Sequence, residues 1–134
     1  MLPAGKRILI PRLTDYMPNI AIHGYSPLES PQLQIKLVDQ IVDSNGWVLH
    51  EKQVSPFSYE IRFELELANI VEMYSALQRT GVQLTRVAHR ALTEMCLCRQ
   101  YLPDPEQIVT ITLRVGMMQE ENLRFRRFLR SHPA

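Results

Sequence analysis

The sequence predicts an α+β domain, a two-layer sandwich in which helices cover one face of a β-sheet. Two observations lead to this prediction. Residues 57–67, FSYEIRFELEL, alternate apolar and polar side chains without a break, which is the period of a strand with one buried face. Residues 70–102 carry apolar or small side chains in alternating steps of four and three, which is the period of a helix.

Further elements can be placed in order from the N-terminus. Residues 1–18 contain three prolines and no sustained periodicity, so we interpret them as an arm. A strand is expected over residues 19–25. Ser30 and Pro31 then predict the start of a helix, because a hydroxyl group can cap the first turn and proline is tolerated at the first helical position.

The helix that starts there has one apolar stripe, with Leu33, Leu37 and Ile41 recurring every four residues, and this stripe is expected to be buried. Asn45-Gly46 is expected to end the helix, with the glycine in the left-handed conformation. Residues 47–54 are predicted to form a strand that is joined to residues 57–67 as a hairpin.

The second helical region is too long for one straight helix in a small domain. Residues 70–102 would span about 50 Å as a straight helix, so we expect a kink or a reversal near Gly81. Asn69, followed three residues later by Glu72, resembles a capping box. A strand over residues 82–87 is the alternative to continued helix, and the unbroken phase of the apolar pattern favours helix.

The last predicted strand covers residues 107–115, and residues 117–134 are expected to form a short C-terminal helical tail. The chain of 134 residues is near the commonest domain size, so we treat residues 1–134 as one domain. Its core, residues 19–116, has the β-α-β-β-α-β order of the ferredoxin-like arrangement, with the second helical element extended and kinked. The likeness is one of architecture and rests on no signature motif.

Composition limits the classes of function. The chain has 15 basic and 14 acidic residues and a formal charge of +1, so no overall field favours nucleic acid or an acidic membrane. Its apolar runs are far shorter than the roughly 20 residues that cross a bilayer. The sequence shows no export signal and only two cysteines, which indicates a soluble protein of the reducing cytoplasm.

The sequence contains no recognisable catalytic or metal-binding motif. Cys96 and Cys98 are two residues apart on a predicted helix and point in different directions, so they cannot share one metal ion. His89 and Cys96 lie two turns apart, roughly 10 Å, too far for a nucleophile and its base. Histidine spacings typical of metal sites and the glycine motifs of nucleotide sites are missing. We expect no metal, no cofactor and no catalysis, although an enzyme of unrecognised type remains an alternative.

The charged face of residues 57–67 is the first candidate binding surface. It can meet water, a second subunit or a ligand, and Arg62 can bridge Glu60 and Glu64 along the strand. We predict Arg62 and Glu64 as ligand-binding residues. His23 and Tyr25, where the first strand runs into a loop, are predicted to join them.

A second candidate surface is the C-terminal segment RFRRFLR. Its arginines Arg124, Arg126, Arg127 and Arg130 can contact a partner protein or nucleic acid, or they can be the solvated side of a packed helix. The leading hypothesis is a non-enzymatic small-molecule- or protein-binding domain that forms a homodimer, with regulation as one role open to it. The alternative is a nucleic-acid-associated protein that uses these arginines.

Overall fold

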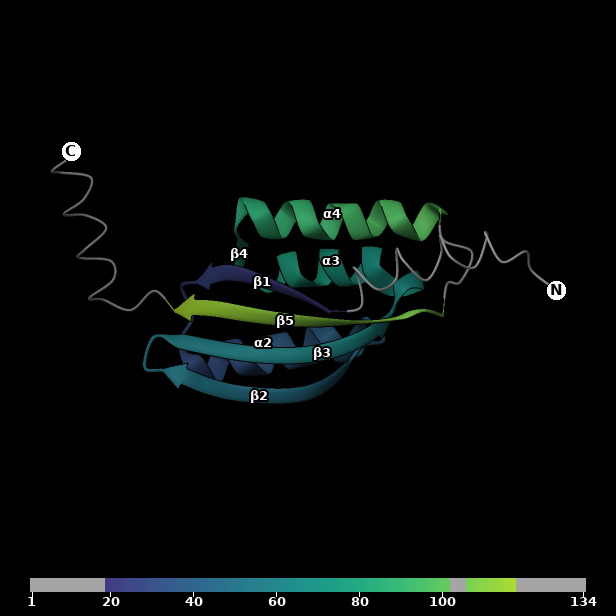
Figure 1. Cartoon of the computed structure of the whole chain (residues 1–134). Helices are drawn as coiled ribbons and strands as arrows, with labels where there is room; N and C mark the ends of the chain where they lie inside the picture. The colour runs from purple at the N-terminus through teal and green to yellow at the C-terminus, as the bar shows by residue number, and fades with distance from the viewer. Residues whose placement is uncertain (1–18, 102–105, 118–134) are drawn as a thin grey trace, which may run out of the picture.

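The computed structural model describes residues 19–101 and 106–117, and the predicted arm and C-terminal tail lie outside them, except for Met117. One five-stranded mixed sheet has the order β2-β3-β5-β1-β4, and the three described helices lie together on one side of it (Figure 1). The prediction of an α+β fold is confirmed. The elements are β1 (Asn19–Ser26), α2 (Ser30–Asp43), β2 (Trp47–Ser55), β3 (Ser58–Glu66), a 3₁₀ turn (Leu67–Asn69), α3 (Ile70–Arg79), β4 (Gln83–Leu84), α4 (Arg86–Tyr101) and β5 (Ile108–Met117).

The strand order differs from the ferredoxin-like order that we predicted. In that order the last strand lies at the edge beyond the first, whereas here β5 lies between β3 and β1. It is antiparallel to β3 and parallel to β1. The reversal between α3 and α4 accounts for the direction of β5, because a single helix would carry the chain to the opposite end of the sheet. Two antiparallel helices return it to the end where β3 finished (Figure 1), so the next strand must run antiparallel to β3.

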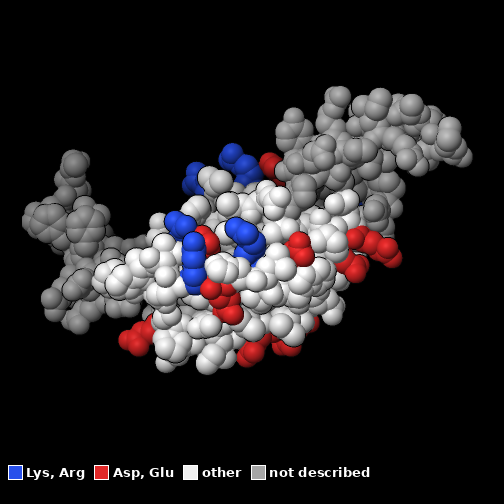
Figure 2. Space-filling model, turned by 60° about the horizontal axis from the view of Figure 1, so that its bottom comes forward, with Lys and Arg blue, Asp and Glu red and all other residues white. Residues whose placement is uncertain are grey.

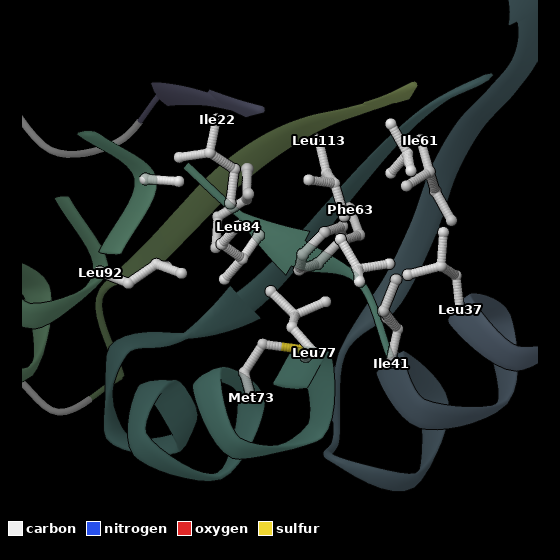
Figure 3. Close-up of a cluster of buried hydrophobic side chains, with 14 of the residues drawn as sticks. Ile22, Leu37, Ile41, Ile61, Phe63, Met73, Leu77, Leu84, Leu92 and Leu113 are labelled. Carbon is white, nitrogen blue, oxygen red and sulfur yellow. The ribbon is translucent and has the colours of Figure 1, made fainter. Parts of the chain in front are cut away.

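The core lies between the sheet and the helices (Figure 3). Alternate residues of β3 and β5 are buried on this side, as predicted, and the stripe Leu33, Leu37 and Ile41 of α2 is completely buried against them. Burial of each large aliphatic side chain contributes about 1.5–3 kcal/mol. The buried residues of the two central strands are Tyr59, Ile61, Phe63 and Leu65 of β3 and Val109, Ile111, Leu113, Val115 and Met117 of β5.

The ends of α2 differ in detail from the prediction. Glu29, not Ser30, occupies the N-cap position, and the Ser30 hydroxyl instead donates a hydrogen bond to Gln53 Oε1 at 2.6 Å. At the other end Asn45, not Gly46, has the left-handed conformation, with φ of 65°. A Cβ atom at Gly46 would lie 3.1 Å from the backbone oxygen of Ile41, which accepts a hydrogen bond from the Gly46 N–H, so the space there is tight.

The break that we expected near Gly81 as a kink or a reversal is a reversal, and the φ of Gly81 is +85°. The second helical region is therefore two helices, α3 and α4, and not the extended, kinked element that we predicted. Both interpretations of the following residues are partly correct, because residues 83–84 form the short strand β4 and helix resumes at residue 86. Helix α3 begins after Asn69 as expected, but Asn69 makes no side-chain capping hydrogen bond, so the predicted capping box is wrong. None of the described helices is long and apolar enough to span a membrane.

Candidate functional site on the open face of the sheet

The face of the sheet opposite the described helices carries the polar half of each alternating strand, and we call it the open face. Successive side chains of a strand point to opposite faces, so the cross-strand registers identify its members. They are Asn19, Ala21, His23 and Tyr25 of β1, Trp47, His50 and Lys52 of β2, Ser58, Glu60, Arg62, Glu64 and Glu66 of β3, and Ile108, Thr110, Thr112, Arg114 and Gly116 of β5.

All four predicted ligand-binding residues lie on the open face, but they do not form one compact site. Arg62 and Glu64 come from β3, whereas His23 and Tyr25 come from β1, and β5 runs between these strands. His23 is level with Arg114, and Tyr25 is level with Gly116. Adjacent strands are about 4.8 Å apart, so the β1 pair lies roughly 10 Å across the sheet from the β3 pair.

Glu60 is the most buried charged group of this face, with 8% of the residue exposed. It accepts a hydrogen bond from Arg114 Nη2 at 2.8 Å, and Lys52 Nζ lies 3.7 Å away. The bond from Arg114 holds the pKa of Glu60 below its usual value, against the opposing effect of burial, and the charges of Lys52 and Arg62 add to the lowering. Glu60 is therefore a fixed anion clamped from both neighbouring strands.

The lowered pKa of Glu60 predicts a dependence of stability on pH. In the unfolded chain a glutamate has a pKa of about 4.3, so ionised Glu60 stabilises the fold above that pH. This contribution is lost as the pH falls through the lower folded-state pKa. In urea unfolding, the stability advantage of the wild type over Glu60→Gln should shrink on acidification below about pH 4.3. An advantage that is unchanged by acidification would contradict this role.

Glu64 is held in a different way, by two neutral donors. The indole N–H of Trp47 donates to Oε1 at 3.0 Å, and the Thr110 hydroxyl donates to Oε2 at 3.1 Å. Trp47 is on β2 and Thr110 is on β5, so this carboxylate is also held from both neighbouring strands. The fold itself therefore fixes the position of the Glu64 carboxylate.

Arg62 lies between these two carboxylates on β3 and does not bridge them, so that prediction is wrong. The side chain is exposed and makes no hydrogen bond or close ion pair with any of the described residues. Its cross-strand neighbours are His50 on β2 and Thr112 on β5, and neither supplies a negative charge. Arg62 is thus a cation near the middle of the face with its hydrogen-bonding groups available.

The charges of the open face are separated along the strand direction. Lys52, Arg62 and Arg114 surround Glu60 in the half of the face nearer the β2-β3 hairpin, whereas Glu64 and Glu66 lie toward the other end of β3. In Figure 2 basic groups gather around acidic groups left of the centre, and further acidic groups lie toward the right and along the lower edge. The face therefore has a basic end and an acidic end.

The cysteines and histidines considered in the sequence analysis give little support for a catalytic or metal site. Burial raises the pKa of both thiols, Cys96 and Cys98, which lowers the thiolate fraction that a nucleophile needs. His89 Nδ1 is hydrogen-bonded to the Tyr74 hydroxyl. Within residues 19–101 and 106–117 no group of three potential ligands is placed to hold a metal ion. The arginines of the second predicted surface, Arg124, Arg126, Arg127 and Arg130, lie outside the described residues.

Comparisons of the chain with protein-family models, curated proteins and solved structures gave no match. What can be inferred about function therefore comes from the geometry and the charges of the open face.

Proposed function

We propose that this chain is a non-catalytic protein-binding domain and that the open face is its contact surface. One observation supports this most strongly: Arg62 has no hydrogen-bonding partner among the described residues, while the charged groups around it are held in place. Glu60 and Glu64 are each bonded to both neighbouring strands. Groups that are already ordered lose little conformational entropy on binding, so such a face is well prepared to receive a partner.

The shape of the face favours a protein over a small molecule. Small-molecule sites are concave and enclose most of the ligand, whereas the surface in Figure 2 is broad and shallow over the described residues. Four strands at about 4.8 Å spacing and about 30 Å length present roughly 600 Å². Stable protein contacts bury about 600–1,000 Å² on each partner, so the open face has the size of one protein interface.

The other parts of the functional hypothesis stay predictions. A regulatory role and a cytoplasmic location are consistent with the fold and follow from no single contact in it. Binding of nucleic acid through the C-terminal arginines is a separate prediction, and it requires binding that is steeply salt-dependent and lost when residues 120–134 are deleted.

Site-specific photocrosslinking tests the proposed function. A photoreactive amino acid at Thr112, beside Arg62 on the open face, should give a crosslink to a protein when the chain is expressed in the cells that encode it. The matched control is the same amino acid at Val87, which is 72% exposed on α4 and should give no such crosslink. Crosslinks from Val87 alone, or from neither position, would refute the open face as the contact surface.

A further inference from the structure

We infer that the protein bound by the open face is a second copy of this chain, packed face to face with the strand directions reversed. This inference rests on the proposed function and names the partner. It depends on three features of the open face: the separation of charge along the strands, the position of Arg62 relative to Glu64, and the area available.

The separation of charge decides how two copies can meet. A two-fold axis that lies along the strands would place the basic ends of both copies together and the acidic ends together. Like charges that face each other across an interface cost several kcal/mol. A two-fold axis perpendicular to the strands, in the plane between the sheets, reverses one copy and places its acidic end over the basic end of the other. The face is self-complementary in this orientation, as a two-fold interface requires.

The order of residues along β3 then sets the pairing. If the axis passes between the level of Glu64 and the level of Arg62, the Arg62 of each copy faces the Glu64 of the other. Glu66 then faces the level of Glu60, whose charge is offset by Lys52 and Arg114 on the two neighbouring strands. Packed sheets are about 10 Å apart, a gap that an extended arginine and a glutamate can bridge. A carboxylate offers about four acceptor sites, so Glu64 can accept from Arg62 while it keeps its bonds to Trp47 and Thr110.

The area and the charges indicate a reversible dimer. About 600 Å² on each copy gives roughly 1,200 Å² in total, which is at the lower end for specific complexes. Ion pairs at such an interface are weakened by salt. Dimerisation should therefore depend on protein concentration and should weaken as the ionic strength rises.

Charge reversal at Arg62 and at Glu64 tests the inference. Sedimentation velocity should show a wild-type dimer that dissociates on dilution. Arg62→Glu and Glu64→Lys should each raise the dimer dissociation constant by at least about tenfold. An equimolar mixture of the two variants should recover the dimer, because the introduced glutamate of one chain then meets the introduced lysine of the other. The matched control Arg90→Glu, an exposed position on α4, should dimerise like the wild type.

If loss of the bonds to Trp47 and Thr110 prevents the folding of Glu64→Lys, which circular dichroism would reveal, Glu66→Lys serves as the second single variant and should also raise the dimer dissociation constant. The mixture is then left out, because residue 66 does not face residue 62, and Arg62→Glu against Arg90→Glu decides. A wild type that stays monomeric at every concentration, an Arg62→Glu variant that dimerises like Arg90→Glu, or a mixture that stays monomeric would overturn the inference. Crosslinks from Thr112 to a different protein, with a monomeric wild type, would retain the proposed function and reject the second copy. Absence of both dimer and crosslink would reject both.

Discussion

Replacement of Phe63 by alanine is expected to lower the free energy of unfolding by about 3–5 kcal/mol. The Phe63 side chain is completely buried at the centre of the core between β3 and the helices (Figure 3). Its removal exchanges favourable burial for a cavity that the surrounding strands cannot close. Thermal unfolding should show a melting temperature lower by more than about 10 °C, and urea unfolding should show a lower midpoint.

An exposed aliphatic residue provides the control for Phe63. Val87→Ala removes methyl groups from a side chain that is 72% exposed on α4, and stability should change by less than about 0.5 kcal/mol. A loss of less than about 1 kcal/mol in Phe63→Ala would show that Phe63 does not lie in a closely packed core. This result would contradict the packing of the helices on the inner face of the sheet.

Replacement of Gly24 by alanine is expected to destabilise the fold by about 1–3 kcal/mol. A Cβ atom at this position would lie 2.7 Å from Val82 Cγ1 and 3.0 Å from the backbone oxygen of Gln83. Gln83 is held by the pairing of β1 with β4, so its oxygen cannot move away without loss of that pairing. Urea unfolding of the variant measures the effect.

The sign of the Gly24→Ala effect is itself the test of this close approach. Where there is space and the backbone conformation is ordinary, glycine to alanine stabilises by about 0.4–1 kcal/mol, because the unfolded chain loses freedom. A stabilised Gly24→Ala variant would therefore contradict the β1-β4 contact. Addition of Val82→Ala removes the nearest atom and should recover part of the loss, with a coupling of more than about 0.5 kcal/mol.

The sequence predicted those features of the fold that depend on local periodicity. The alternation in residues 57–67 and 107–115 identified two strands and their buried faces, because side-chain direction within one strand is a local property. The four-residue spacing in α2 identified its buried stripe, because residues four apart lie on the same face of a helix. A break near Gly81, either a kink or a reversal, was also predicted, from the length that a straight helix would need.

The order of the strands could not be predicted in this way. The direction of β5 depends on which end of the sheet the chain has reached, and thus on whether the second helical region bends or reverses completely. Its position between β3 and β1 depends on pairing with strands that are distant in the sequence. A kink and a reversal fit the same pattern around Gly81, yet only a reversal makes β5 antiparallel to β3. The choice between them is made by packing between segments that are distant in the sequence.

For the candidate site, the sequence predicted which residues share the open face but not which of them contact each other. His23, Tyr25, Arg62 and Glu64 all lie on the open face, but Arg62 does not bridge the glutamates of its own strand. Same-face neighbours along a strand are about 7 Å apart, whereas strands are about 4.8 Å apart, so the partners across the sheet are closer. Trp47 was missed as a partner of Glu64 because the register that makes them neighbours is not visible in either strand alone.

The central claim is that this chain associates through the open face and not through its helices. The most direct test is to compare the amide NMR spectra of dilute and concentrated wild-type protein. We predict that signals from residues 58–66 and 108–116 shift with concentration, while those from residues 86–100 of α4 stay in place. Shifts confined to α4, or no shift at any concentration, would contradict the claim.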